Sequence, residues 1–245
     1  MQINFVDTID STNLYLYTNA NEGKITEDTA IAASMQTLGK GRRGRTFFSP
    51  GQTGVYLSLL LHPDATVAQS TLITTMMASA AARALELNGS PEIQIKWVND
   101  LYVKGKKVGG ILTECSPNII DGRPEFVVVG IGVNLLPPEG GFPEDIKQRA
   151  GFVFEKSISL DEKETLRKKI AGDIVDCFME YYRNFPSREH FEDYKKRLFI
   201  IGLDVMIVDG PKVKVAGIDE DFRLIVRFPD GSIENLDAGE VSLII

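Results

Sequence analysis

The sequence is poor in the residues from which nucleophilic and metal sites are most often built. Its 245 residues contain two cysteines, Cys115 and Cys177, and two histidines, His62 and His190. Two cysteines at this spacing suit neither a disulfide framework nor a zinc site, and we interpret both as reduced core thiols. Neither histidine lies near a candidate nucleophile in the sequence, which disfavours Ser-His-Asp and Cys-His catalysis.

Long apolar runs and an excess of positive charge are absent too. No apolar stretch is long enough to span a membrane, and the first five residues, MQINF, lack the charged start and apolar run of a signal peptide. We therefore expect no membrane partner and a cytoplasmic location. The formal net charge of -7 at pH 7 argues against a general nucleic-acid-binding protein.

The positive charge that the chain does have is concentrated in one loop. Residues 36–50 read QTLGKGRRGRTFFSP, in which four cations and three glycines alternate between two apolar segments, 29–35 and 55–61. Fixing about eight such residues costs roughly 8–16 kcal/mol, and four charge-assisted hydrogen bonds return about 6–12 kcal/mol. We therefore expect a lid that is mobile when empty and that closes over a phosphate. The alternative is a solvated basic loop without a ligand.

The glycines of this loop also match two known phosphate-binding patterns. Gly39-x-Gly41-x-x-Gly44 fits the dinucleotide fingerprint, and the same segment is one residue from a P-loop. Both patterns need a helix that begins at the last glycine. Residues 47–51, FFSPG, indicate a turn instead, so we reject both.

The order of the expected elements indicates an α+β fold. Apolar spacing predicts helices over 70–87 and 187–199, and a third that begins with a capping box at Asp161 and Glu164. Strand–helix–strand segments mixed with hairpins indicate a sheet with helices on one face. From Ile201 the chain changes to short β segments with Asp-Gly turns. We therefore expect one domain over 1–200 and a small all-β domain over 201–245.

Five short blocks, rich in glycine and polar residues, follow one another along the larger domain. They are Ser11-Thr12-Asn13, Gln36-x-x-Gly39-x-Gly41-Arg42-x-Gly44-Arg45, Lys96-Trp97-x-Asn99-Asp100, Lys107-x-x-Gly110-Ile111-Leu112 and Gly130-Ile131-Gly132-Val133-Asn134. In this order they resemble the biotin–protein ligases, also called biotin–[acetyl-CoA-carboxylase] ligases. The resemblance covers nearly the whole chain and includes a terminal Gly239-Glu240-Val241.

The resemblance implies a fold and a domain composition. We expect a central mixed β-sheet with helices mainly on one face, as in class II aminoacyl-tRNA synthetases, followed by a small SH3-like β-barrel. Family members that repress transcription carry a DNA-binding domain before the Ser-Thr-Asn block. That block begins at Ser11 here, so we expect the form without it. The sequence departs from the family at Val98, where proline is usual, at Phe47, where tryptophan is frequent, and at Lys40, where arginine is common.

The resemblance also implies a two-step reaction. Biotin and ATP, with Mg²⁺, form biotinyl-5′-AMP, and a lysine of a biotin carboxyl carrier protein then takes the biotinyl group. The first step brings a carboxylate to the α-phosphate, and two anions about 4 Å apart repel by roughly 4 kcal/mol at an effective dielectric near 20. A cation between them is therefore required, and Lys107 occupies the family's position for it, with Arg42 as the second catalytic residue.

The remaining site residues are assigned by family position. The residues implied for biotin are Ser11, Thr12, Asn13, Gln36, Lys40, Gly41, Arg42, Lys107, Gly110, Leu112 and Gly130. Those implied for ATP or the adenylate are Gly39, Arg42, Arg45, Phe47, Asn99, Lys107 and Asn134. Asp100 is implied as an outer ligand of the magnesium ion that accompanies ATP.

Two other functions stay open at this point. A lipoate or octanoate–protein ligase performs the same two steps on a related fold, but its characteristic Ser-Gly-Gly-Gly stretch is missing. A non-catalytic nucleic-acid-binding module would use the basic loop, but no aromatic residues are interleaved within its cationic run. Family precedent further predicts a homodimer through an exposed sheet edge.

Overall fold

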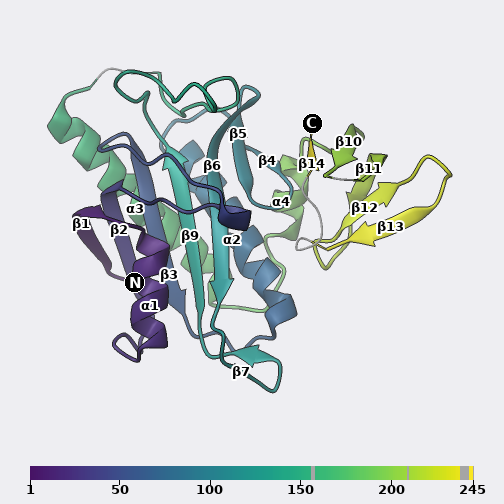
Figure 1. Cartoon of the computed structure of the whole chain (residues 1–245), viewed down its shortest axis with the longest axis horizontal. Helices are drawn as coiled ribbons and strands as arrows, with labels where there is room; N and C mark the ends of the chain where they lie inside the picture. Colours follow the sequence, from purple (N-terminus) through teal and green to yellow (C-terminus); the bar gives the residue numbers. More distant parts are fainter. Residues whose placement is uncertain (156–157, 209, 238–242, 245) are drawn as a thin grey trace.

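A seven-stranded mixed sheet forms the centre of the molecule in the computed structural model, which describes residues 1–155, 158–208, 210–237 and 243–244. Its strand order is β1-β2-β3-β9-β6-β5-β4 (Figure 1). The strands are β1 (Ile3–Ile9), β2 (Thr29–Gln36), β3 (Gly54–Leu61), β4 (Gln94–Lys96), β5 (Asp100–Val103), β6 (Lys106–Cys115) and β9 (Val127–Asn134). The first pair, β1 and β2, is parallel, and the other neighbours are antiparallel.

Helices cover the two faces of this sheet unequally. Helices α2 (Ser70–Leu87) and α3 (Leu160–Tyr182) pack on one face and form the main core with it. The shorter α1 (Thr12–Asn21) lies on the other face, where Leu16 joins a second cluster with Leu60 and Val128 (Figure 1). Because β3 is covered on both sides, all eight of its residues are buried. The predicted α+β fold with helices mainly on one face is confirmed.

A second sheet of five antiparallel strands follows the larger one, in the order β13-β12-β11-β10-β14. Its strands are β10 (Asp204–Ile207), β11 (Lys212–Ile218), β12 (Leu224–Arg227), β13 (Ile233–Leu236) and β14 (Leu243–Ile244). The expected small C-terminal β unit is therefore present, and a domain boundary at residue 201 stays a prediction. The block Gly239-Glu240-Val241 lies outside the described residues.

Short elements complete the chain. They are the 3-10 turns η1 (Arg42–Gly44) and η2 (Val67–Gln69), the hairpin strands β7 (Ile119–Ile120) and β8 (Arg123–Pro124), and the helix α4 (Phe191–Arg197). Among the described residues, no helix combines the length and the apolar character that crossing a membrane requires.

Two expected helix starts were wrong. The capping box of α3 is formed by Ser159 and Glu162, not by Asp161 and Glu164, because the Ser159 hydroxyl accepts from the Glu162 amide while Glu162 accepts from the Ser159 amide. Helix α4 begins at Phe191 instead of residue 187, because residues 183–186 and 189–190 form turns. Acidic residues occur in the first turn of both helices, so composition alone did not identify the first residue.

The second sheet is joined to the first through an aromatic cluster. The ring of Phe222 stacks on His190 with centroids 4.8 Å apart and meets Phe191 and Tyr194 edge to face. The Phe222 carbonyl accepts a hydrogen bond of 2.9 Å from Nε1 of Trp97, which follows β4. Phe222 is fully buried, so the two sheets share one continuous core.

Candidate functional site

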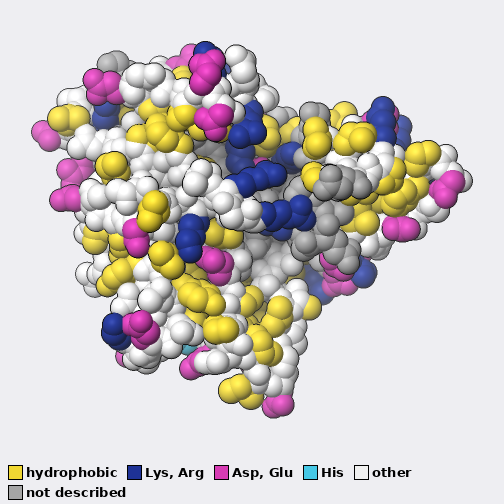
Figure 2. All heavy atoms as spheres, in the orientation of Figure 1, with side chains coloured by type: hydrophobic (Ala, Val, Ile, Leu, Met, Phe, Trp, Pro, Cys, Tyr) yellow, Lys and Arg dark blue, Asp and Glu magenta, His cyan; other side chains and the backbone are white. Residues whose placement is uncertain are grey.

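A cavity of about 620 Å³ lies where the basic loop crosses strands β6 and β9. It is lined by residues of that loop, of the start of α1, of the β4–β5 connection and of the two strands. Among the described lining residues, seven are Lys or Arg and one, Asp100, is acidic. Lys and Arg side chains gather on this face beside the second sheet (Figure 2). The cavity is therefore suited to an anionic ligand.

The basic loop has more internal structure than its composition predicts. The Gly41 amide donates to the Arg45 carbonyl at 2.7 Å, and the Phe47 amide donates to the Gly39 carbonyl at 2.8 Å. Gly44 has a φ of 70°, a region that glycine enters without steric cost, which permits the tight turn between these bonds. The loop is thus closed by its own backbone, and its mobility without ligand stays a prediction.

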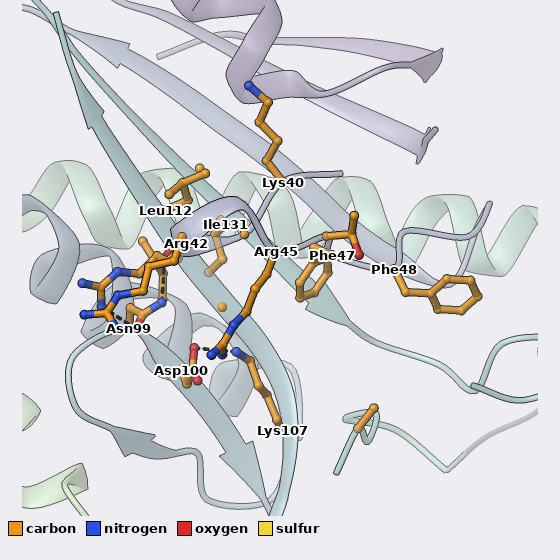
Figure 3. Close-up of a pocket in the computed structure, with 18 of the residues that line it drawn as sticks. Lys40, Arg42, Arg45, Phe47, Phe48, Asn99, Asp100, Lys107, Leu112 and Ile131 are labelled. Carbon is orange, nitrogen blue, oxygen red and sulfur yellow. Dashed lines mark hydrogen bonds and ion pairs between the residues drawn. The ribbon is translucent and has the colours of Figure 1, made fainter. Parts of the chain in front are cut away.

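Arg42 reaches from this loop to the connection between β4 and β5. Its Nη1 donates to Oδ1 of Asn99 at 3.2 Å, and Asn99 Nδ2 in turn donates to the Ile111 carbonyl at 2.9 Å (Figure 3). Burial lowers the pKa of the Arg42 guanidinium, although it stays charged at any physiological pH. A half-buried cation at this position gives a strong interaction with an anion in the cavity, because the local dielectric is low.

Three more charges meet at the beginning of β5, around Asp100. Lys107 Nζ lies 2.6 Å from Oδ1 of Asp100, and Arg45 extends from the loop toward the same carboxylate (Figure 3). Lys96 lies close by, and its pKa is lowered chiefly by burial and also by the charges of Lys107 and Arg45. One carboxylate thus faces several cations. Lys40 points away from this group, toward α1 (Figure 3).

The opposite wall of the cavity carries hydroxyl and amide groups. Ser11 caps α1 by accepting from the Leu14 amide at 3.4 Å. The Thr12 amide and hydroxyl both donate to Oε1 of Gln36, at 2.9 and 3.1 Å. Gln36 Nε2 donates to the Ser49 hydroxyl at 3.0 Å, so the glutamine is fixed at both ends. This wall offers neutral donors and acceptors in place of charge.

Glycines make room for both walls. A Cβ at Gly130 would lie 1.9 Å from Oδ1 of Asn13, and one at Gly132 would lie 2.5 Å from the ring of Phe47. These two positions therefore admit the asparagine and the aromatic ring against the sheet. At Gly39 a Cβ would lie 2.4 Å from the Phe47 carbonyl, so this glycine permits the closure of the loop.

Known proteins identify the family to which these features belong. The sequence model of the biotin/lipoate A/B protein ligase family matches residues 5–134. The chain is 32% identical to the bifunctional ligase/repressor BirA of Bacillus subtilis, over 97% of this chain and 72% of that protein. The chain belongs to this ligase family.

Further relatives extend the match over the whole chain. The biotin--[acetyl-CoA-carboxylase] ligase of Mycobacterium tuberculosis is 25% identical over 90% of this chain and 79% of its own length. The structure of biotin protein ligase from Aquifex aeolicus in complex with biotin and ATP superposes with a TM-score of 0.76, at 27% identity, over 99% of this chain and 98% of that one. The fold of the present ligase-family chain, including its second sheet, is therefore that of a solved family member.

The structure brings together the residues that sequence analysis assigned to the ligase site, with one exception. The predicted residues that line the cavity are Ser11, Thr12, Asn13, Gln36, Lys40, Gly41, Arg42, Arg45, Phe47, Asn99, Asp100, Lys107, Gly110, Leu112, Gly130 and Asn134. Gly39 is the exception, because it lies at the base of the loop and has the closing role described above. Asn134 lines the cavity with its amide bonded to the Gly151 carbonyl at 3.0 Å.

Sequence analysis missed several lining residues of this ligase. Ser58 and Arg149 line the cavity, and neither belongs to a block of the family pattern. Ser58 is one hydroxyl in a buried strand, and Arg149 lies in a long loop, so nothing in the sequence indicates that either residue lines a cavity. The position of Lys96 is indicated by the sequence, because strand alternation places it on the face opposite Ile95 and Trp97.

The cavity does not hold a complete metal site by itself. Among the described residues, no group of three or more His, Cys, Asp or Glu side chains could bind a metal ion. Asp100 is the one acidic residue described in the lining. Mg²⁺ in nucleotide sites is typically bound by one or two carboxylates together with substrate phosphates and water. The residues present therefore fit a magnesium ion that is brought by a nucleotide.

Proposed function

We propose that this protein activates biotin with ATP to form biotinyl-5′-AMP and pyrophosphate, and then transfers the biotinyl group to a lysine of a biotin carboxyl carrier protein. One observation carries the proposal: a single cavity joins a neutral wall of hydroxyl and amide groups to a strongly cationic wall beneath one loop. A carboxylic acid with a polar ring at its far end fits the first wall, and a nucleotide phosphate fits the second.

The neutral wall suits the ureido ring of biotin. That ring presents a carbonyl acceptor beside N–H donors, and Ser11, Thr12 and Gln36 supply both kinds of partner. The apolar part of the ligand would lie along Gly110 and Leu112, where the strand surface is apolar or lacks a side chain. Asn13 supports this wall by accepting a hydrogen bond from Ser58 Oγ.

Lys107 is the residue that we assign to the adenylation step. An ammonium group has three N–H donors, and the 2.6 Å ion pair with Asp100 occupies one of them. Two donors are then left for the substrate carboxylate and the α-phosphate. Placed between these anions, Lys107 offsets a repulsion of roughly 4 kcal/mol and stabilises the charge that develops in the transition state.

Arg42 and the basic loop retain the intermediate. The mixed anhydride of biotin and AMP is hydrolysed by water, so the loop has to exclude solvent until the acceptor arrives. Arg42 and Arg45 would bind its phosphate, while Phe47 covers Gly132. The ion pair of Asp100 with Lys107 leaves its second carboxylate oxygen for a magnesium ion carried by ATP.

The acceptor in the second step is a carrier-protein lysine. Its neutral amine attacks the biotinyl carbonyl and releases AMP. We further propose a homodimer through the free edge of β1, which ends the large sheet. The carrier protein and the homodimer are both expected from the family, and the reaction chemistry does not require the homodimer.

The test is a direct biotinylation assay. The purified chain, ATP, Mg²⁺, biotin and a carrier domain are incubated together, and the carrier is weighed by mass spectrometry. The expected result is a mass gain of one biotinyl group that requires ATP. A parallel reaction contains lipoate in place of biotin. Pyrophosphate exchange that responds to lipoate and not to biotin would assign the chain to the lipoate branch of the family. Salt-sensitive binding of RNA or DNA without ATP use would contradict ligase activity altogether.

A further inference from the structure

A chain of hydrogen bonds connects Glu114, on β6 two residues after the cavity-lining Leu112, to Thr12 in the neutral wall. Asn13 Nδ2 donates to Oε2 of Glu114 at 3.0 Å and to the Leu112 carbonyl at 3.2 Å. Ser58 Oγ lies 2.6 Å from Asn13 Oδ1 and 2.7 Å from Thr12 Oγ1. Asn13, Ser58 and Thr12 are buried, so these bonds form away from solvent.

Strand register explains why these groups meet. Ser58 on β3 and Leu112 on β6 both pair with Gly130 on β9, the strand between them. Because Gly130 has no side chain, the amide of Asn13 lies directly on that strand. The three residues thus form one row across the sheet, over which the start of α1 is placed.

The direction of every hydrogen bond in this chain follows from its charged end. A carboxylate and a carbonyl can only accept, so the Asn13 atom that faces them is the amide nitrogen. The Asn13 oxygen then faces Ser58, whose single proton is used there. The Thr12 hydroxyl has one proton, which it donates either to Ser58 Oγ or to Oε1 of Gln36. In either case Thr12 has no proton left to offer a ligand.

Thr12 therefore acts toward a ligand as an acceptor. Its neighbour Ser11 has the opposite polarity, because Ser11 Oγ accepts from the Leu14 amide and keeps its proton as a donor. The wall presents a donor beside an acceptor, which is the complement of a ring carbonyl beside a ring N–H. Asn13 sets the polarity of Ser58, which also lines the cavity: reversing the Asn13 amide would turn Ser58 from an acceptor into a donor.

We propose that Glu114 is a positioning residue that fixes the hydrogen-bond polarity of the biotin-binding wall through Asn13 and Ser58. The inference rests on the proposed function, because it assigns the polarity to recognition of the ureido ring. Glu114 is half-buried and does not line the cavity, so its effect on a ligand is indirect.

Isosteric variants test this role. Glu114→Gln keeps an acceptor without the charge, and Glu114→Leu has a similar size without an acceptor. We expect the dissociation constant for biotin, measured by calorimetry, to rise in the order wild type, Glu114→Gln, Glu114→Leu, with the last weaker by about tenfold, the change that one hydrogen bond of ordinary strength gives. A packing role would instead make the polar Gln variant no better than Leu.

Steady-state kinetics provide the second readout. The KM for biotin should rise in Glu114→Leu, while the KM for ATP and the kcat at saturating biotin stay within about twofold of wild type. Glu125→Leu is the matched control, because Glu125 makes a similar bond to Asn118 Nδ2, at 3.1 Å, in an exposed segment away from the cavity. It should change none of these constants. Thermal unfolding of each variant verifies that it is folded.

A double-mutant cycle tests whether Glu114 affects biotin binding through Ser58. If Glu114 acts through Ser58, Ser58→Ala should weaken biotin binding in the wild type and add little in Glu114→Leu. Additive effects, or a Glu114→Leu variant that binds biotin as wild type does, would overturn the inference and leave the proposed function standing. A wild-type chain that binds no biotin would overturn both.

Discussion

His190 should make the stability of this protein depend on pH in a way that one substitution removes. Its ring is fully buried between Tyr181 and Phe222, where the two sheets meet. Thr75 Oγ1 donates to the Leu72 carbonyl, so His190 Nε2, 2.8 Å from that hydroxyl, must carry the proton and donate to it. Nδ1 is then the site that would be protonated. Among the described residues it has no hydrogen-bond partner.

The size of this pH effect follows from the free-energy cost of placing a positive charge on the buried His190 ring. Burial lowers the pKa of His190 from 6.5 to about 3. Between these values the unfolded chain binds a proton that the folded protein does not, so the free energy of unfolding falls as the pH falls. The slope is about 1.4 kcal/mol per pH unit, which gives a loss of about 2 kcal/mol between pH 7 and pH 5 and about 5 kcal/mol once the pH is below 3.

Urea unfolding of the wild type and of His190→Gln at pH 7, 6 and 5 measures the contribution of His190 to the free energy of unfolding. Carboxylates titrate in both proteins, so the difference between the two stabilities isolates the histidine. We expect Gln to be less stable at pH 7, because it lacks the ring stack, and to recover about 2 kcal/mol relative to wild type at pH 5. Equal slopes for the two proteins, with unchanged m-values, would refute the assignment of a neutral, buried imidazole.

Three further substitutions test the cavity. Gly130→Ala would place a Cβ 1.9 Å from Oδ1 of Asn13, so biotin affinity measured by calorimetry should fall by about tenfold or more, and unchanged affinity would contradict the packing described here. Lys107→Ala should slow biotin-dependent pyrophosphate exchange by about a thousandfold, from a loss of roughly 4 kcal/mol, and near-normal exchange would remove Lys107 from the mechanism. Arg42→Ala should release bound biotinyl-AMP about tenfold to a hundredfold faster in a filter-binding chase, since one or two charge-assisted bonds are lost; an unaltered release rate would exclude its clamping role.

The parts of the fold that sequence analysis predicted correctly are those with a local signal. Helix 70–87 was predicted to the residue, because its apolar face is long and the Asn-Gly pair after it ends the helix. Either Ser11 or Thr12 fits the cap of a helix that begins near Asn13, because hydroxyls precede a helical segment there; in the structure Ser11 is the N-cap and α1 begins at Thr12. The first residue of α3 was not, because several acidic residues near it fit the same cap pattern.

The parts of the site that were missed depend on pairing between distant strands. Nothing near Ser58 or Glu114 in the sequence indicates that both contact Asn13; the register of β3, β9 and β6 brings them together. The glycines could be predicted to admit a close neighbour, but not which one. At Gly130 the neighbour is the Asn13 side chain, and at Gly132 it is the ring of Phe47.

The second sheet has a closer relation to the cavity than its short, separate β segments suggest. Trp97 lines the cavity and donates its buried Nε1 to the carbonyl of Phe222, while the Tyr194 hydroxyl donates to the carbonyl of the next residue, Val98, at 2.9 Å. Leaving the indole N–H without an acceptor would cost about 1–3 kcal/mol, so the second sheet stabilises the backbone that carries Asn99 to Arg42. The second sheet therefore supports the end of the cavity that we propose for the nucleotide.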